Sequence, residues 1–438
     1  MIEKIHLKES LAKALKTKEN NRTIFRYTAS FDITENNYTF NLNHDNIFYI
    51  SNLDKKKFGI DKCIDLKLTS KKNILDLINI NTNIISYGEN KNDPVKFFGN
   101  VGFDMDSKFS YPVENILKGY FFIPKILIEK TDKYATITFH TLLNKNIKSI
   151  IKEYYELESK ITLQINKNNI KNNILKIKPN PDKKHYTEIF NKYIDDINKN
   201  KYSKIVLSRI QEIELKSELD YIDIFNNMDD NCTNYLFSVN QNKKFFGSTP
   251  EKLIHLHDNK IKSDAIAGTY PKKNKYKKYE LLNNKKELNE HNFVIKHLSE
   301  TLKKYLKNIK ISKSKILELT HLYHIQTSFT GKLSKQIHIL EILYNLYPTP
   351  AVAGYPIKKT INEINKNESF SRGWYSGCFG WFDQNGNGEF DVSIRCAIGE
   401  NNKLIVFSGG GIVKGSNLEK EWLETESKFK HLLSSIIK

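Results

Sequence analysis

The chain of 438 residues is 39% hydrophobic and 12% aromatic, which is enough apolar material for a large folded core and excludes a disordered polymer. Its formal net charge of +19 comes almost entirely from lysine, because the chain has only five arginines. Arginine is the side chain that grips phosphates and base edges with two parallel hydrogen bonds, so this composition argues against a nucleic-acid-binding protein.

Neither a membrane span nor a secretion signal is predicted. No stretch approaches the roughly twenty apolar residues that cross a bilayer. Residues 1–22 have the pattern of an amphipathic helix, without the apolar block and cleavage site of a signal peptide. The four cysteines are scattered and form no C-x-x-C pair, which predicts reduced thiols in a cytoplasmic protein, with no disulfide framework and no metal knuckle.

The first part of the chain, residues 1–180, has strand-like alternation and no chemical motif. The stretches TIFRYTASFDI and YATITFHTLL predict strands, separated by turns rich in lysine and asparagine. The polar stretch IKPNPDKKHY at 177–186 contains two prolines and is the best candidate for an internal boundary, although the alternation continues beyond it. We expect this part to complete a sheet.

From about residue 185 onward the predicted elements are denser. Strands are predicted at 203–215 and 234–240, and residues 243–271 predict a strand, a tight turn and a hairpin. An apolar stripe predicts a helix from about 276 to 306.

Residues 373–413 predict an antiparallel meander of strands joined by turns. In its segment DVSIRCAI, Val392 and Ile394 belong to a buried stripe that continues through Cys396. Arg395 points to the other side of that strand, where it faces either water or a polar cavity.

The final helix is predicted to open with Ser416 and Glu419 at the spacing of a capping box. At about 100° per residue, Glu421, Glu424 and Lys428 fall within roughly 60° of one another, beside the core stripe. Such an arrangement is either an ordinary surface ion pair or one wall of a site.

A second pair of glutamates one turn apart, Glu287 and Glu290, lies in the segment KELNEH of the earlier helix. Two acidic ridges that face each other would supply the hard carboxylate oxygens that Mg²⁺ prefers. In a chain with 50 acidic residues this pairing is a weak signal by itself.

The glycines of SGGGIVKGS at 408–416 lie between a predicted strand and the final helix. Their backbone N–H groups could meet a carboxylate or a phosphate, or the segment could simply be a tight turn. The pattern matches neither a P-loop nor a dinucleotide-binding motif.

Ten blocks between about 200 and 435 resemble, in the same order, the chorismate-utilising enzymes, which comprise isochorismate, salicylate, anthranilate and aminodeoxychorismate synthases. The blocks are SKIVLSR, FFGSTPEKL, AIAGTYP, KELNEH, HIQTSFTGKL, YPTPAVAGYP, RGWYSGCFGW, FDVSIRCAI, SGGGIV and EWLETESK. The resemblance implies an α+β fold in one large domain over 1–438, with stacked antiparallel sheets and outer helices. In that domain residues 185–438 would be the catalytic half, and residues 1–180 would complete the sheet.

The resemblance also implies a binding site for chorismate, a small dianion with two carboxylates. It implies that Glu290 and Glu424 hold Mg²⁺, with Glu287 and Glu421 supporting the metal through water. The implied substrate contacts are those of Arg395 and Tyr375 with the enolpyruvyl carboxylate, the backbone of Gly409, Lys428, Thr269 near the ring, and His324 near the leaving hydroxyl or the ring carboxylate. For His324 the alternative is a core histidine with satisfied hydrogen bonds.

Two positions favour one reaction within the family. Lys204 matches the lysine that activates water in isochorismate and salicylate synthases, and it must be uncharged to act as a base. Glu251 matches the general acid that protonates the departing hydroxyl, for which a closed apolar pocket would supply a raised pKa. Exposed charges at strand ends are the alternative for both. Ala267 stands where aminodeoxychorismate synthases have a nucleophilic lysine, which argues against covalent amination.

We therefore expect an isochorismate synthase that adds water at C2 of chorismate and expels the C4 hydroxyl, with Mg²⁺. The long N-terminal part favours the menaquinone-pathway type over the siderophore type by analogy of fold. A salicylate synthase is the nearest alternative, and no single residue excludes it. More distant alternatives are an anthranilate synthase component, which Lys204 disfavours, and a non-catalytic basic binding protein. We expect no nucleic-acid, membrane or glutaminase partner, and either a monomer or a homodimer.

Overall fold

The computed structural model describes most of the chain. The described residues are 1–31, 39–80, 82–131, 134–163, 172–240, 242–272 and 278–437. Within these ranges almost all strand pairs are antiparallel, and the pairing of β1 with β5 is parallel. No helix of the described residues has both the length and the apolarity needed to cross a bilayer.

The strands of the first half form one part of the main sheet. They are β1 (Ile24–Phe31), β3 (Ile47–Ser51), β4 (Lys56–Leu68), β5 (Ile84–Gly88), β6 (Lys96–Val101), β7 (Gly119–Lys130) and β8 (Ala135–Leu142), while β2 (Thr39–Phe40) and β9 (Thr162–Leu163) make a separate small pair. The long strand β7 has a nearly continuous apolar run, because it buries nearly every side chain and pairs with β4, β6 and β8.

The strands of the second half continue the same hydrogen-bonded sheet. They are β10 (Ile174–Asn180), β11 (Lys204–Leu215), β12 (Thr233–Ser238), β13 (Lys243–Thr249), β14 (Lys252–His257), β15 (Lys260–Pro271), β16 (Leu306–Ile311), β17 (Lys315–Glu318), β18 (Leu322–Leu333), β19 (Gly354–Tyr355), β20 (Cys378–Asp383), β21 (Gly388–Val392), β22 (Cys396–Glu400) and β23 (Lys403–Val413). Two antiparallel pairings join the halves, β3 with β12 and β6 with β20, so the first half extends the sheet of the second.

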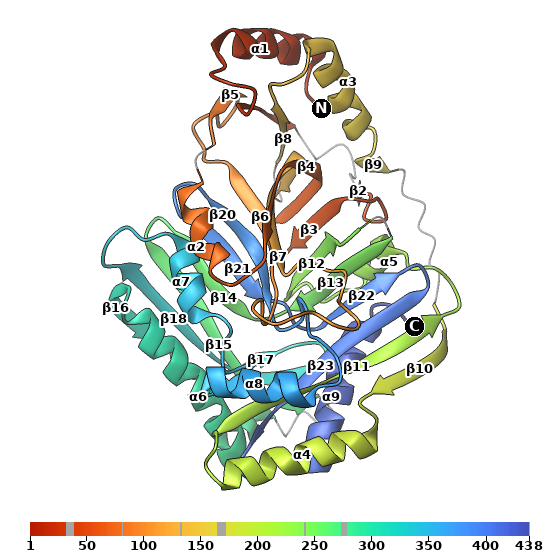
Figure 1. Ribbon diagram of the computed structural model, residues 1–438, viewed down its shortest axis with the longest axis vertical. Helices are drawn as coiled ribbons and strands as arrows, with labels where there is room; N and C mark the ends of the chain where they lie inside the picture. The colour runs from red at the N-terminus through yellow and green to blue at the C-terminus, as the bar shows by residue number, and fades with distance from the viewer. Residues whose placement is uncertain are drawn as a thin grey trace.

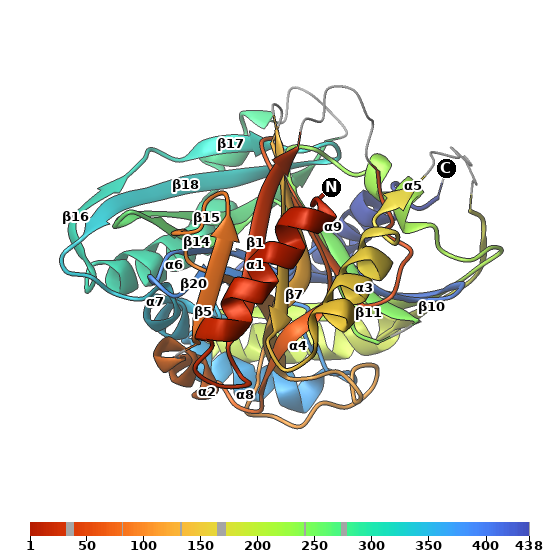
Figure 2. The same ribbon diagram turned by 90° about the horizontal axis from the view of Figure 1, so that it is seen from above.

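The helices lie mainly at two ends of the molecule. They are α1 (Lys4–Thr17), α2 (Asn73–Asp76), α3 (Ile147–Glu158), α4 (Lys183–Asn198), α5 (Tyr221–Asn226), α6 (Lys285–Leu302), α7 (Ile339–Leu346), α8 (Ile357–Asn367) and α9 (Leu418–Leu433). Helices α4, α6, α8 and α9 gather at the lower end in Figure 1, whereas α1 packs beside α3 at the opposite end, which faces the viewer in Figure 2.

Apolar clusters fill the space between the sheet parts and under the helices. One cluster is rich in aromatic rings and spans both halves, with Phe48 and Phe98 of the first half packed near Phe237 and Phe379 of the second. Burial of such large rings is a main source of stability in a domain of this size.

The predicted boundary at 177–186 is a turn from strand to helix. Strand β10 ends at Asn180 and pairs with β11, and α4 begins at Lys183 with Asp182 as its N-cap. This cap fixes the start of α4, which packs on Ile205 and Leu207, the face of β11 opposite to Lys204 and Val206.

Helix α6 begins at Lys285, so the predicted start near 276 is wrong; residues 273–277 lie outside the described part of the chain. The side chain of Asn284 accepts hydrogen bonds from the backbone N–H groups of Lys286 and Glu287. Because this cap fixes the first turn, Glu287 stands at the start of the helix with Glu290 one turn further along.

Helix α9 starts one residue later than a capping box at Ser416 would require. Asn417 is the N-cap, and its side chain accepts from the backbone N–H of Lys420 at 3.1 Å. Ser416 instead accepts from the N–H of Val413. The capping box is therefore wrong, because asparagine one position on caps at least as well as serine.

The predicted meander over 373–413 is two hairpins, β20 with β21 and β22 with β23. Between β21 and β22 the chain leaves the sheet, and Arg395 adopts a left-handed conformation with φ of 51°. The continuous stripe predicted through Val392 and Ile394 is therefore wrong. The chain changes partners here, because β21 pairs with β14 while β22 pairs with β13.

Candidate functional site

A cavity opens between the sheet and the two acidic helices. Its wall includes eight of the twelve site residues predicted from the sequence: Glu251, Thr269, Glu290, His324, Tyr375, Arg395, Gly409 and Lys428. These residues come from segments far apart in the chain, and strands β15, β18 and β23 carry three of them. The sheet thus brings together what the sequence separates by up to 177 positions.

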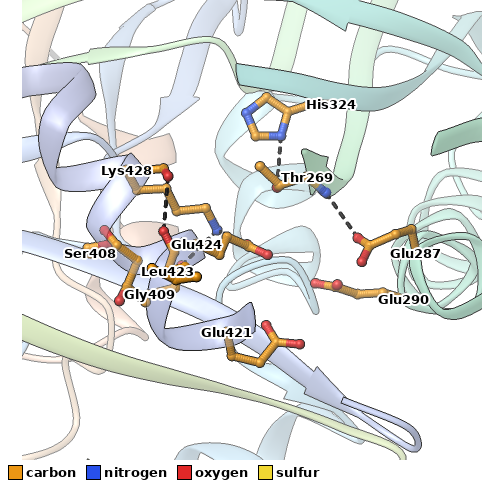
Figure 3. A network of polar contacts seen from close by, with 12 residues as sticks. Thr269, Glu287, Glu290, His324, Ser408, Gly409, Glu421, Leu423, Glu424 and Lys428 are labelled. Atoms are coloured by element: carbon orange, nitrogen blue, oxygen red, sulfur yellow. Dashed lines mark hydrogen bonds and ion pairs between the residues drawn. The ribbon is translucent and has the colours of Figure 1, made fainter. Parts of the chain in front are cut away.

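The other four predicted residues, Lys204, Glu287, Glu421 and Glu424, are not among the residues that line the cavity. Glu287 is on α6 with Glu290, and Glu421 and Glu424 are on α9. Figure 3 shows these carboxylates facing one another across the gap between the two helices. The predicted acidic face of the last helix is confirmed, and Glu426 lies off it, in an ion pair with Arg209 at 2.7 Å.

One buried lysine and two partly buried lysines neutralise the acidic ridges. Lys204 Nζ lies 3.1 Å from Glu290 Oε1, and Lys428 Nζ lies 2.6 Å from Glu424 Oε1. Lys286, on the first turn of α6, lies 2.8 Å from Glu421 Oε1. A carboxylate cluster in a largely closed site needs such countercharges, because an isolated buried charge is costly.

The ridge carboxylates differ in their affinity for protons. Burial raises the pKa of Glu287 and of Glu421 to about 7 in each case, against the opposing effect of Lys286. Burial also acts to raise the pKa of Glu290, but nearby ammonium groups, with Lys204 foremost, outweigh it and bring that pKa below its usual value. Of these three carboxylates, Glu290 therefore stays ionised most firmly.

Lys204 is fully buried at the first position of β11. Its neighbours across the sheet are Val413 of β23 and Tyr355 of β19. The alternative of an exposed charge at a strand end is therefore wrong for Lys204. Its carbon chain fits beside Gly411, where an added Cβ would lie 2.9 Å from Lys204 Cε.

Glu251 is also buried, in the short connection between β13 and β14. Burial raises the pKa of Glu251 to about 8, although Lys204 and Arg395 pull it downwards. A carboxyl group with this pKa holds its proton at neutral pH. It can therefore give that proton to a leaving group, as a general acid must.

His324 links the sheet to Arg395. Arg395 Nη2 lies 2.9 Å from His324 Nε2, and Thr269 Oγ1 lies 3.0 Å from His324 Nδ1. Because a guanidinium group only donates, Nε2 accepts and the ring proton is on Nδ1, which donates to Thr269. Burial, reinforced by Arg395, holds the pKa of His324 well below its usual value, so the ring is neutral.

The cavity holds unpaired donors that suit an anion. Arg395 Nε is buried with no hydrogen-bond partner among the described residues, although Nη2 is engaged by His324. Tyr375 is buried with its hydroxyl 3.5 Å from Ser208 Oγ. Lys428 donates to the carbonyl oxygen of Gly409 at 2.8 Å, which holds its ammonium group against β23. A carboxylate entering here would meet several donors at once.

Ser376 was not predicted, yet it is one of the residues that line the same cavity. The residue is almost fully buried, has a left-handed backbone with φ of 60°, and its Oγ has no partner among the described residues. It follows Tyr375 directly. A left-handed backbone is unfavourable for serine, and a buried hydroxyl without a partner is uncommon. Both features are seen only in the folded structure, so the sequence alone could not identify this residue.

Arg372 and Glu368 form a buried pair beneath the cavity and were also not predicted. Arg372 donates to the carbonyl oxygens of Val352 and Val206, and Glu368 accepts from the backbone N–H of Ser208 at 2.9 Å. Since Val206 and Val352 line the cavity, this pair fixes two of its walls. The sequence offered one indication of the importance of Arg372, which is that arginine is scarce in this chain.

No group of three or more histidine, cysteine, aspartate or glutamate side chains in the described residues is arranged to hold a metal ion. The carboxylates of α6 and α9 nevertheless offer oxygen donors on both sides of one gap (Figure 3). Glu421 Oε2 is buried there without a hydrogen-bond partner among those residues.

Comparison with known proteins places this geometry in context. The family model described as chorismate binding enzyme matches residues 9–437. The vibriobactin-specific isochorismate synthase of Vibrio cholerae is 30% identical over 60% of this chain and 69% of that protein. The isochorismate synthase MenF of Bacillus subtilis is 26% identical over 77% of this chain and 74% of that protein.

Among solved structures, MenF, the menaquinone-specific isochorismate synthase from Escherichia coli, superimposes with a TM-score of 0.80 at 20% sequence identity. The match covers 98% of this chain and 100% of that one. The predicted α+β class with stacked antiparallel sheets is thereby confirmed.

Proposed function

Since the chain belongs to the chorismate binding enzyme family, we propose that it is an isochorismate synthase, an isomerase that adds water at C2 of chorismate and expels the C4 hydroxyl. The relatives from Vibrio cholerae and Bacillus subtilis both carry this activity in their names. The observation that carries the proposal is the pair of buried groups at one site: the amine of Lys204 and the protonated carboxyl of Glu251.

In this reaction the two groups act on opposite faces of the ring. Lys204, once uncharged, accepts a proton from the water that attacks C2. Glu251 gives its proton to the C4 hydroxyl, which leaves as water. Transfer of this kind by positioned groups accelerates reactions by about 10²- to 10⁴-fold. The raised pKa of Glu251 keeps its proton available at neutral pH.

The remaining cavity residues bind the dianion. Arg395 offers its free Nε to the enolpyruvyl carboxylate, and Tyr375 offers its hydroxyl. The backbone of Gly409 and the ammonium group of Lys428 complete the anion site, with Thr269 near the ring. His324, held neutral, orients Arg395 and is a hydrogen-bond partner near the ring. These contacts position the substrate and thereby lower the entropy cost of the reaction.

The acidic ridges fit a magnesium ion. Mg²⁺ in proteins usually takes one or two carboxylates and completes its octahedron with water and substrate oxygens. Glu290 and Glu424 would hold it, and Glu287 and Glu421 would support it through water. When bound, the ion would neutralise and orient the ring carboxylate.

The proposal extends to the setting of the enzyme. The described cysteines are free thiols, which supports a cytoplasmic protein. The match over nearly the whole chain to a menaquinone-specific enzyme supports that pathway type over the siderophore type. We propose an enzyme domain over 1–438 that works as a monomer or homodimer without a glutaminase subunit.

Product analysis tests the proposal. Purified protein is incubated with chorismate, with and without Mg²⁺, and the products are separated by liquid chromatography. We expect isochorismate in an equilibrium mixture with chorismate, and at least about 100-fold slower conversion in Lys204→Ala and in Glu251→Gln.

The other outcomes decide between the alternatives. Salicylate with pyruvate would replace the proposal by a salicylate synthase. Unchanged chorismate, together with salt-sensitive binding to nucleic acid, would favour a non-catalytic basic protein on this scaffold. Full activity in either variant would refute the role given to that residue.

A further inference from the structure

Lys286 occupies the gap between the two acidic ridges. Its Nζ lies 2.8 Å from Glu421 Oε1 on α9, and on its own helix it lies 3.1 Å from Glu287 Oε1 and 3.8 Å from Glu290 Oε2. The pair with Glu421 joins α6 to α9. The sequence motif drew attention to the glutamates of KELNEH and not to this lysine.

Each of the three lysines in the cluster has a different glutamate as its closest partner. Lys204 pairs with Glu290, and Lys428 pairs with Glu424 on the same helix. Lys286 forms ion pairs with Glu287 and Glu421. Neither of these glutamates pairs with another lysine in the described residues. The side chain of Lys286 is 20% exposed and that of Glu421 only 2%, so water screens their attraction weakly.

We propose that Lys286 is a built-in countercharge that holds the acidic ridges together before a divalent cation binds and that sets how tightly this cation binds. The inference rests on the magnesium site of the proposed function. One ammonium group within 4 Å of three carboxylates stabilises their close approach without metal. The same positive charge opposes the arrival of a second cation nearby, so affinity for the ion is lower than four carboxylates alone would give.

Three variants distinguish the effect of the positive charge of Lys286 from the effect of the packing of its side chain. Lys286→Met keeps much of the carbon chain and removes the charge, and Lys286→Arg keeps the charge. Lys285→Met removes a charge from the neighbouring exposed position of the same helical turn and is the matched control. Circular dichroism establishes that each variant is folded.

Binding of Mg²⁺ is measured by calorimetric titration of the full chain without chorismate, and thermal unfolding is followed in EDTA and in saturating MgCl₂. We expect Lys286→Met to bind Mg²⁺ about tenfold more tightly than the unmodified protein, because a repulsive charge is gone. We also expect its unfolding temperature to be lowered in EDTA and largely restored by MgCl₂. Lys286→Arg and Lys285→Met should resemble the unmodified protein in both measurements.

The inference is overturned if Lys286→Met binds Mg²⁺ as tightly as the unmodified protein or more weakly. It is also overturned if this variant stays unfolded in saturating MgCl₂, since the lysine would then supply something that a divalent cation cannot replace. Failure of the proposed function looks different: the unmodified protein would neither bind Mg²⁺ nor convert chorismate.

Discussion

A single buried carboxyl group shows how the site obtains its chemistry. Glu251 is an ordinary glutamate whose ionised form is disfavoured because the cavity removes it from water, and this raises its pKa to about 8. The cations nearby, Lys204 and Arg395, reduce the shift without cancelling it. The local balance of burial and charge therefore stores a proton at the position where a leaving group needs one.

This balance predicts the pH dependence of the reaction. The group must be protonated to act, so its deprotonation above about pH 8 should lower kcat/KM, by about tenfold per pH unit once Lys204 is uncharged. Both carboxylates of chorismate are ionised throughout that range and add no slope of their own. The measurement is kcat/KM from pH 6 to 10 at saturating Mg²⁺. A profile that stays level to the alkaline end would contradict the assignment of Glu251 as the acid.

The same shift has a consequence for stability with a definite sign. The pKa of Glu251 is raised in the folded state, so its favourable contribution is complete below about pH 4.5 and is lost as pH rises towards about 8. Replacing it by glutamine removes this loss. The unfolding temperature of Glu251→Gln relative to the unmodified protein should therefore be higher at pH 8 than at pH 5. This measurement tests the raised pKa of Glu251 independently of catalysis.

At this scale the sequence was most informative where a residue type is rare for its position. Lys204 and Glu251 were found through matching blocks, since alternation along a strand cannot show that a charge at its end is buried. Ser376 and Arg372 were missed for a related reason. Their importance lies in a free hydroxyl and in bonds to distant carbonyl groups, and neither can be seen before the chain is folded.

At the scale of elements, the site depends on the close approach of helix α6 to strand β23. Gly411 of β23 faces Glu290, and a Cβ at this position would overlap Glu290 Oε1 as well as crowd Lys204. Gly410 is different, because the nearest atom to its added Cβ is Glu421 Oε2 at an ordinary 3.5 Å. Glycine is thus needed at position 411 because a side chain there would overlap Glu290. This requirement is additional to any contact that the backbone of the glycine run makes with an anion.

This difference gives a matched pair of variants. Gly411→Ala should lower kcat/KM about 100-fold, because a displacement near 1 Å in the residues that position a reaction has effects of that size. It should also raise the Mg²⁺ concentration that gives half the maximal rate. Gly410→Ala should retain most activity. The measurement is the kinetics of both variants at several Mg²⁺ concentrations, with circular dichroism as a check on folding. Equal behaviour of the two variants would contradict the proposed geometry of the ridges.

The helix and strand types were mostly predictable from periodicity, and their ends were not. Asn284 and Asn417 decide where α6 and α9 begin, and each competes with a neighbouring residue that could also start a helix. The break at Arg395 was hidden for another reason. The apolar alternation continues on both sides of it, because β21 and β22 are both buried strands although they pair with different partners.

At the scale of the whole molecule, the first half matters through the sheet it completes. None of the ten blocks that resemble the family lies in it, and its strand β6 pairs with β20 of the second half. Packing explains the weak signal, since many apolar side chains can fill one core provided that volume and pattern are kept. Catalytic positions admit few residue types, so the second half carried nearly all the recognisable sequence.

Removal of residues 1–180 is therefore predicted to abolish folding rather than only weaken catalysis. Without β3 and β6, strands β12 and β20 lose a neighbour, and Phe237 and Phe379 lose the rings of Phe48 and Phe98. The fragment 181–438 should show no cooperative thermal transition in differential scanning calorimetry and should convert no chorismate. The control chain lacks only residues 1–22, which include α1 and none of the strands in these pairings; it should unfold cooperatively at a lower temperature and remain active. An active, cooperatively folded 181–438 fragment would show that the second half forms its site unaided.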